Sequence, residues 1–333
     1  FVIPLNAAIT VIALWFISPA LNVEAATETV RIEDETGAIQ EFEVARRGYH
    51  QEVVSFFWDN QTKDSELDWL EYGLPLMLTY DINRISPVIT AITPLDAGSL
   101  KNKLRDQGFD RLTDVPRGLA IEVSRDRRSA ALVTGEFRVE GDARIISASI
   151  IDTASGELLG TRTASAKDWM SAIDQVTAAI LEFTEVTPAD NQSDDPLRQH
   201  LSNSLAAIQH FAFGLVAIGL DNDYPRGIAE FNSALKLDAA FAEARTELSL
   251  AYYLSGDIES ARVSASDALR NSYRLSDSSR FIIKANRYIY DGDFERGERV
   301  LDIWAQVQPS NRRAWQSIAQ LATLRGGEEG LEK

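Results

Sequence analysis

The chain has 333 residues, of which 45% are hydrophobic and 9% aromatic, and its formal net charge at pH 7 is −17. This hydrophobic fraction is sufficient for sizeable buried cores, so the composition excludes an intrinsically disordered chain. A strongly acidic chain repels phosphate backbones, which argues against nucleic acid as a partner. Because the sequence contains no cysteine, it excludes disulfide bonds, thiolate metal sites and cysteine nucleophiles.

Residues 1–23 carry no charged side chain and predict a transmembrane helix. As an α-helix this segment would be about 34 Å long, against a hydrocarbon core of about 30 Å. A secretory signal peptide is the alternative, but its apolar region is usually only about 7–15 residues long. The lipid bilayer is therefore an expected partner of residues 1–23. The acid-rich stretch that follows favours the non-cytoplasmic side, so we expect a single-pass protein of a bacterial inner membrane with the residues after 23 in the periplasm.

Residues 24–48 are predicted to connect the membrane helix to the first domain. Short alternating apolar runs flank the turn-like sequence Glu35-Thr36-Gly37, and this pattern predicts a small hairpin. We expect its many charged side chains to be solvated.

Residues 49–186 show the pattern of an α/β domain with a mixed sheet and packed helices. Strands are predicted at 53–58, 87–93, 133–139, 143–152 and 157–165, from apolar runs and period-two alternation. Helices are predicted between the first two strands, at 96–107, at 116–128 and from Trp169 onward. In the first of these helices, Pro75 is expected in the first turn, where proline is tolerated.

Two segments of this region resemble a known domain, the one similar to the amino-terminal part of TolB. The run VVSFFWDNQTKDSELDWLEYGLPLMLTYDIN resembles its opening, in which a strand leads into a Leu-x-x-Gly helix. The segment AALVTGEFRVEGDARIISASIIDTASGELLGTR resembles its hairpin, which usually ends in Asp-x-x-Thr-Gly. The matching residues in this segment are Gly135, Val139, Gly141, Asp142, Ile151, Asp152, Gly156 and Glu157. Phe57 departs from the pattern, because proline is usual there.

The resemblance extends over residues 49–186 and implies a non-catalytic domain of bacterial envelope proteins. In that family the domain often follows a transmembrane helix whose cytoplasmic side bears a Ser/Thr kinase, a nucleotide cyclase or a winged-helix domain. The resemblance therefore implies a signalling module upstream of Phe1, with a Ser/Thr kinase as the leading expectation. Any protein kinase or cyclase activity would belong to that module.

Residues 187–196 are rich in small and acidic side chains and predict a linker. Residues 197–333 then show self-similarity, because Gly256, Gly292 and Gly326 are 36 and 34 residues apart. The surrounding pattern of small and bulky residues resembles the tetratricopeptide (TPR) repeat. We expect about three repeats plus the start of a fourth, with a turn at each of these glycines. The overall prediction is an α/β domain followed by an all-α TPR solenoid.

A solenoid of this kind is a protein-binding scaffold, and the resemblance implies a groove lined by the first helix of each pair. The groove candidates are Glu243, Thr246, Leu250, Tyr253, Ser279, Ile282, Asn286, Ile289, Arg313, Gln316 and Gln320. Packing within the helices or plain solvent exposure is the alternative for each of them. The set lacks the dense Lys/Arg clamp that would capture an acidic peptide tail.

No catalytic motif is found in the sequence: there is no P-loop, no Gly-x-Ser-x-Gly and no His-Arg-Asp. The three histidines, His50, His200 and His210, are too widely spaced for a helical ligand pair. We therefore predict no catalytic residue, cofactor or metal ligand in this chain.

These features together predict the extracytoplasmic sensing and protein-interaction region of a single-pass membrane protein. Protein partners are expected at the TPR groove and at the α/β domain, and homo-oligomerisation is left open. The alternative is a membrane-anchored structural accessory subunit, or scaffold, of an envelope complex.

Overall fold

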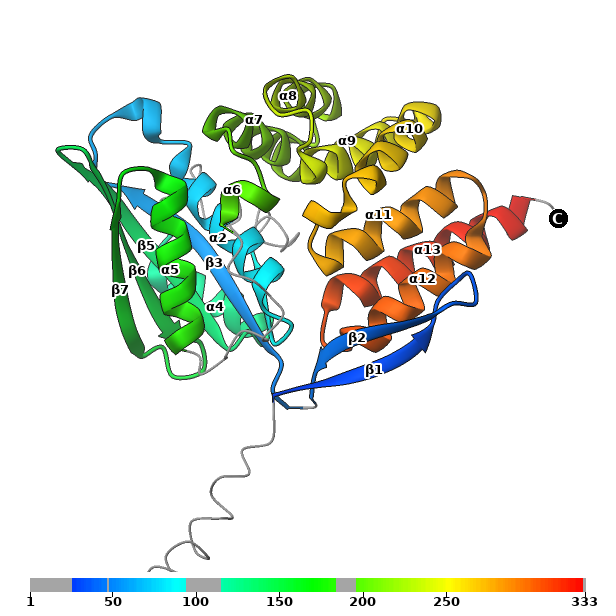
Figure 1. Cartoon of the computed structure of the whole chain (residues 1–333), viewed down its shortest axis with the longest axis horizontal. Helices are drawn as coiled ribbons and strands as arrows, with labels where there is room; N and C mark the ends of the chain where they lie inside the picture. The colour runs from blue at the N-terminus through cyan, green and yellow to red at the C-terminus, as the bar shows by residue number, and fades with distance from the viewer. Residues whose placement is uncertain (1–25, 47, 94–114, 184–195, 332–333) are drawn as a thin grey trace, which may run out of the picture.

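The computed structural model describes residues 26–46, 48–93, 115–183 and 196–331. The predicted membrane helix at 1–23 and the helix expected at 96–107 lie outside these ranges. Within the described ranges, no helix is both long enough and apolar enough to cross a membrane. Figure 1 shows a sheet with its helices, an array of helices beside it, and a two-stranded hairpin next to the end of the array.

The hairpin begins the described chain and consists of β1 (Thr27–Glu33) and β2 (Ile39–Ala45) in antiparallel pairing. Its turn is held by Asp34, whose carboxylate accepts hydrogen bonds from the hydroxyl and the N–H of Thr36 at 2.6 and 2.8 Å. These bonds hold the pKa of Asp34 well below its usual range. The hairpin expected from the sequence is therefore present.

The expectation that the charges of this hairpin are solvated is wrong at its tip. The Glu35 side chain is only 2% exposed, and its carboxylate pairs with the Lys284 ammonium at 2.7 Å. Toward the open end of the hairpin, Val44 packs against Ile303 of α12 (Phe294–Val307). The hairpin lies along this helix in Figure 1. It docks there because its apolar side chains must be covered. Residues 24–48 alone do not show which part of the chain covers them.

A five-stranded mixed sheet follows, with the strand order β4-β3-β5-β6-β7. The central strand β3 pairs in parallel with β4 and β5, whereas β5, β6 and β7 form an antiparallel meander. The strands are β3 (Gln51–Asn60), β4 (Ile89–Ile92), β5 (Ala131–Glu140), β6 (Ala143–Asp152) and β7 (Leu158–Ala166). All five strands predicted from the sequence are present.

Helices cover both faces of the sheet (Figure 1). α2 (Leu70–Ile85) and α5 (Trp169–Phe183) pack against each other and against one face. α4 (Arg117–Asp126) lies on the other face, as right-handed crossovers require when the chain moves from β3 to β4 and then back to β5. The result is the mixed α/β architecture that the sequence predicts.

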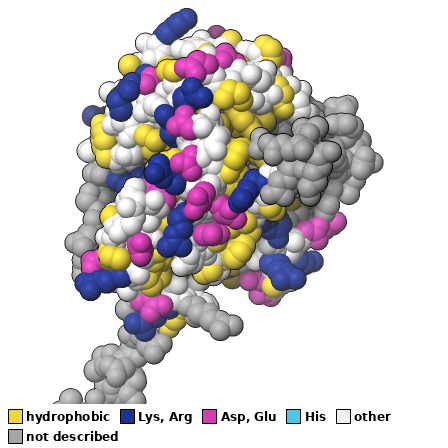
Figure 2. Space-filling model, turned by 90° about the vertical axis from the view of Figure 1, so that its right-hand side faces the viewer, with side chains coloured by type: hydrophobic (Ala, Val, Ile, Leu, Met, Phe, Trp, Pro, Cys, Tyr) yellow, Lys and Arg dark blue, Asp and Glu magenta, His cyan; other side chains and the backbone are white. Residues whose placement is uncertain are grey.

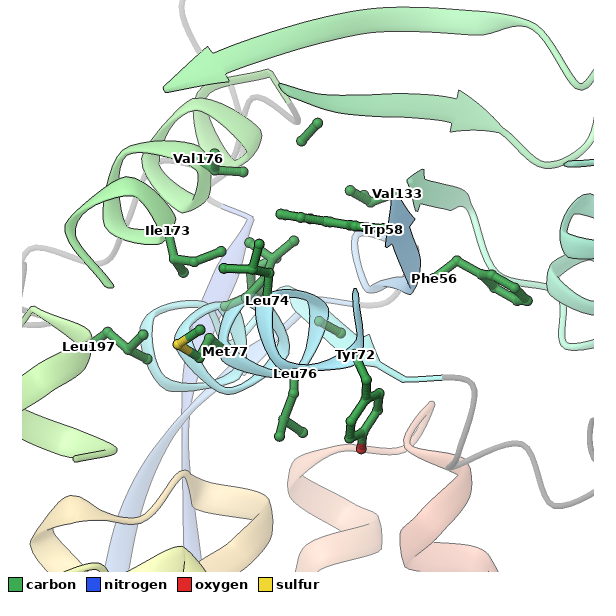
Figure 3. Packing of buried hydrophobic residues seen from close by; sticks show 14 of the residues in the cluster. Phe56, Trp58, Tyr72, Leu74, Leu76, Met77, Val133, Ile173, Val176 and Leu197 are labelled. Carbon is green, nitrogen blue, oxygen red and sulfur yellow. The ribbon is translucent and has the colours of Figure 1, made fainter. Parts of the chain in front are cut away.

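The largest core fills the space between α2, α5 and the sheet. Trp58, Leu74, Val133 and Ile173 converge there, all with 0% exposure (Figure 3). The indole of Trp58 lies directly over Gly135, where a Cβ atom would come within 2.8 Å of the ring. Glycine at this position therefore lets the largest side chain of the core lie flat against β5.

The position of Pro75 differs from the expectation, because it lies inside α2 rather than in the first turn. The helix already begins at Leu70, after the short 3-10 turn η2 (Ser65–Leu67). Proline removes only the hydrogen bond to the Glu71 carbonyl at this point. Twelve of the 16 residues of α2 are buried, so packing on nearly all sides offsets the missing bond.

From residue 196 onward the chain folds into consecutive helical hairpins, each helix packing on the next. The elements are α6 (Leu197–His200), α7 (Leu205–Val216), the π-helical turn η5 (Ala217–Asp221), α8 (Tyr224–Leu237), α9 (Ala242–Leu254), α10 (Ile258–Arg270), the 3-10 turn η6 (Ser272–Arg274), α11 (Asp277–Tyr290), α12 and α13 (Arg312–Leu331). The second helix of each pair begins at an equivalent aspartate: Asp223, Asp257 or Asp293. Its carboxylate accepts a hydrogen bond from the N–H three residues later, at 3.0–3.1 Å.

The expected turn is present at two of the three regularly spaced glycines. Gly256 and Gly292 both have positive φ, 89° and 77°, and end the first helix of their pairs. At the third position the expectation is wrong, because α13 continues through Gly326 to Leu331. A glycine inside a helix costs only about 1 kcal/mol relative to alanine, so it does not by itself end the helix.

Gly214 provides a test of how closely the helices approach. It lies on α7, and a Cβ atom there would come within 2.4 Å of the Phe231 ring on α8. We expect Gly214→Ala to lower the free energy of unfolding by about 1–3 kcal/mol, because the ring must move in a packed core. Urea unfolding followed by far-UV circular dichroism measures the change.

Gly118→Ala on α4 is the matched control, because a Cβ atom there meets nothing within 4 Å. Alanine is the better helix former, so this variant should be neutral or slightly more stable than the wild type. Equal destabilisation in the two variants would contradict the close approach of α7 and α8.

The sheet and the helical array share one continuous hydrophobic core. The Tyr80 ring of α2 lies 5.7 Å from that of Phe211 on α7, and Phe211 in turn lies 4.9 Å from Phe241. A buried polar pair lies at the same junction, with His200 Nε2 3.4 Å from Asp81 Oδ1. The two units therefore pack directly on each other through an apolar interface, whereas the sequence predicts only a linker between them.

Candidate protein-binding groove

A cavity of about 320 Å³ lies where the sheet unit meets the helical array. One wall comes from α2 and β4, and the other from η5, α9, α11 and α13. The residues that decide its chemistry are Glu52, Tyr72, Leu76, Tyr80, Asn83, Thr90, Ile92, Arg127, Leu215, Ile218, Glu247, Ser276, Ser278, Ser279, Asn311, Arg312, Arg313 and Gln316. Hydroxyl, amide and charged groups alternate with apolar ones, a combination that suits binding of a polypeptide segment. We call this cavity the groove.

The structure brings together four of the eleven groove candidates from the sequence. Ser279, Arg313 and Gln316 line the groove. Glu243 lies beneath them, 2% exposed and hydrogen-bonded to Ser279. These four residues come from α9, α11 and the start of α13.

Four other candidates have packing roles. The Thr246 hydroxyl bonds to a carbonyl of its own helix at 3.1 Å. The Tyr253 ring stacks on that of Tyr290, with 4.9 Å between centroids. Ile282 and Ile289 belong to apolar clusters between α11 and its neighbours. The remaining three are not part of the groove: Leu250 and Asn286 are half-buried, and Gln320 is exposed.

The carboxyl group of Glu243 is electrostatically unusual. Burial raises its pKa to about 7, and the negative charge of Glu247 raises it as well, against the hydrogen bond from Ser279 and the charge of Arg313. Its Oε2 atom is buried without a hydrogen-bond partner. Arg313 approaches Glu247 only to 3.9 Å, so this pair is a loose one. The floor of the groove therefore holds a carboxyl group whose charge changes near neutral pH.

The contribution of α2 to the groove was missed in the sequence. Tyr72, Leu76, Thr79, Tyr80 and Asn83 form a second stripe on this helix, at spacings of three and four residues. In Figure 3, Tyr72 and Leu76 point away from the sheet, toward the helical array. A helix with two such stripes must be covered on both sides, so the pattern itself could have indicated a second packing surface.

The edge strand of the sheet beside the groove is capped by a side chain. Asn83 accepts a hydrogen bond from the Ala91 N–H at 2.7 Å and donates one to the Ala91 carbonyl at 2.8 Å. Unpaired edge groups would otherwise offer a pairing site for another strand. Recognition in the groove is therefore expected to rely on side chains more than on strand addition at Ala91.

The outer surface of the array carries charges of both signs. Figure 2 shows Lys and Arg interspersed with Asp and Glu on this side, with hydrophobic side chains between them. Several of these charges join successive helices, as in Arg262 with Asp291 at 2.9 Å and Arg325 with Glu298. Exposed pairs of this kind contribute at most about 1 kcal/mol each. In the part of the chain that the structure describes, no group of three or more His, Asp or Glu side chains could hold a metal ion.

No protein-family description and no curated protein matches this sequence. Among solved structures, the chain is similar to the LpoB C-terminal domain from Escherichia coli, with 11% identity and a TM-score of 0.27, over 35% of this chain and 83% of that one. It is similar to TolB from Acinetobacter baumannii, with 14% identity and a TM-score of 0.28, over 50% of this chain and 33% of that one. It is also similar to lipoprotein GNA1162 from Neisseria meningitidis, with 12% identity and a TM-score of 0.29, over 40% of this chain and 94% of that one.

A TolB structure is among these matches. At TM-scores below 0.3, however, these likenesses carry no conclusion about activity or partners. The class of protein is defined by the molecule itself: a mixed α/β unit packed against an array of helical hairpins, with a groove between the two.

Proposed function

We propose that this chain is the extracytoplasmic protein-interaction region of a single-pass bacterial inner-membrane protein, and that it binds a polypeptide segment in the groove. The observation that carries the proposal is that Ser279, Arg313 and Gln316, expected from the repeat pattern to bind a partner, line one cavity. The helical hairpins, with their aspartate caps and glycine turns, support TPR-type repeats. The α/β unit, which forms the other wall, would contact the same partner.

The membrane anchor and the signalling role are parts of this proposal that rest on the sequence. Residues 1–23 supply the anchor by length and by the lack of charge. The link to a cytoplasmic module, with a Ser/Thr kinase as the leading expectation, rests on the family resemblance alone. The reading frame upstream of Phe1 tests it directly.

The absence of cysteine permits one experiment on both location and binding. Gln316→Cys places a single thiol at the groove, and Glu259→Cys places one on α10, where the wild-type side chain is 74% exposed. Intact spheroplasts are treated with a membrane-impermeant maleimide that carries a photoreactive group. We expect both thiols to react, and only the one at position 316 to give a discrete protein adduct after illumination.

The possible failures are distinguishable. Absence of reaction at both positions in spheroplasts, with reaction after lysis, would contradict the periplasmic location. Reaction without an adduct at position 316, or with the same adducts at both positions, would contradict binding in the groove. An adduct of constant stoichiometry under all growth conditions would favour the accessory-subunit alternative over sensing.

A further inference from the structure

A second cavity, of about 550 Å³, lies under the β1–β2 hairpin and is separate from the groove. Its walls come from the hairpin, from the end of α2, and from α11 and α12. This volume is within the range of about 300–1,000 Å³ that is usual for small-molecule sites. The hairpin and three helices therefore surround a space large enough for a small ligand.

One side of this cavity is apolar. Phe42 of β2 lies 5.7 Å from Phe281 of α11, measured between ring centroids. Val300 and Ile303 of α12 lie beside them and are 1% and 2% exposed. Phe42 and Phe281 are only partly buried, so this side offers an aromatic surface for a hydrocarbon group.

The other side carries two guanidinium groups. Arg84, at the end of α2, donates a hydrogen bond to the Tyr273 carbonyl at 3.3 Å, while its Nε atom is buried without an acceptor. Arg280 pairs with Asp277. Burial lowers the pKa of Arg280, and the positive charge of Arg84 lowers it further. The two guanidinium groups are thus close enough to repel each other, and only Arg280 has a carboxylate partner among the described residues.

None of the other carboxylates on the lining forms an ion pair with Arg84 among the described residues, and each contacts a different partner. The pairs are Glu35 with the Lys284 ammonium, Glu41 with the Arg31 guanidinium, Glu43 with the Thr27 hydroxyl and Asp34 with the N–H and hydroxyl of Thr36. Arg84 forms no ion pair within the described ranges. Arg84 is half-buried, and a guanidinium without a carboxylate partner favours an anionic ligand.

We propose that this cavity binds a small apolar carboxylate. Arg84 and Arg280 would hold the carboxylate, because a guanidinium matches its two oxygens, and Phe42 and Phe281 would cover the apolar group. A free hydrophobic amino acid and the C-terminal residue of a peptide share this chemistry. The ligand would contact the hairpin, the sheet unit and the helical array at once, and this site does not depend on the groove.

Isothermal titration calorimetry on the purified chain tests the proposal with three probes. N-acetyl-L-phenylalanine represents a peptide end, L-phenylalanine represents a free amino acid, and N-acetyl-L-phenylalaninamide lacks the carboxylate. We expect at least one of the two acids to bind, and the amide to bind at least about tenfold more weakly. The tighter of the two acids identifies the source of the ligand.

Arg84→Gln should weaken binding of the preferred acid at least about tenfold. Arg84→Lys should weaken it less, because lysine keeps the positive charge, although it cannot donate two parallel hydrogen bonds to the carboxylate. Arg270→Gln is the control, since its side chain is 71% exposed on α10. Thermal melts by circular dichroism verify that each variant is folded. If Arg84→Gln is not folded, Arg84→Lys takes its place in the binding test. Absence of heat from both acids at millimolar concentration, equal binding of acid and amide, or an unchanged affinity in the folded Arg84 variant would overturn the proposal.

Discussion

Replacement of Trp58 by alanine is expected to lower the free energy of unfolding by about 3–5 kcal/mol. The side chain is completely buried, and it lies over Gly135, which has no side chain that could move into the space. The indole Nε1 has no hydrogen-bond partner, so the loss comes from packing and from the cavity left behind. Urea unfolding followed by far-UV circular dichroism measures the change.

Trp315→Ala is the matched control for this prediction. Trp315 is 54% exposed, and its indole donates a hydrogen bond to the Pro309 carbonyl at 2.8 Å. We expect a loss of no more than about 1 kcal/mol from this variant. Equal losses in the two tryptophan variants would mean that the space between α2, α5 and the sheet is not the main core.

The second large effect is expected in the pH dependence of stability, through Glu243. Its pKa is about 7 in the folded chain, against an ordinary value of 4.5 for a glutamate carboxyl group. Because the folded state holds the proton more tightly, stability falls as the pH rises through this window. The group destabilises the folded chain above neutral pH by up to about 3 kcal/mol. Glu243→Gln removes this penalty, so the variant should be more stable than the wild type at pH 8 and similar to it at pH 4.

The comparison requires unfolding curves at several pH values between 4 and 8 for the wild type, for Glu243→Gln and for Glu259→Gln. Glu259→Gln is the control, because Glu259 is an exposed glutamate on the same array. It should leave the pH profile unchanged. If Glu243→Gln gave the same profile as the wild type, the carboxyl group would not be buried as described.

The elements of this fold could be predicted well because each has a local pattern. Alternation in β5 depends only on neighbouring residues, and the turns at Gly256 and Gly292 depend only on the residues around each glycine. Local patterns also explain the errors: Pro75 and Gly326 are residues that usually interrupt helices, and in this chain the helices continue through them. Tertiary packing decided the outcome at Pro75, where nearly every side of α2 is covered.

The placement of the units on one another could not be predicted, because it depends on contacts between distant parts of the chain. Glu35 and Lys284 are far apart in sequence, and neither has a neighbour that indicates the pair. For the same reason the repeat pattern indicated Ser279, Arg313 and Gln316 as groove residues, but not Tyr72 and Asn83 on the opposite wall. A family pattern describes a groove within the repeats, whereas here the α/β unit forms half of it.

The hairpin has a mechanical consequence. Thr27 and Ala45 are paired, so the chain enters and leaves the hairpin at the same end. A pulling force on the chain before Thr27 would therefore load the hydrogen bonds between β1 and β2 one pair at a time, and would separate the two strands from their open end. Meanwhile β2 would be held back by the contact of Val44 with α12. Tension from the amino-terminal side would thus lengthen this connection at low force before it strained the five-stranded sheet.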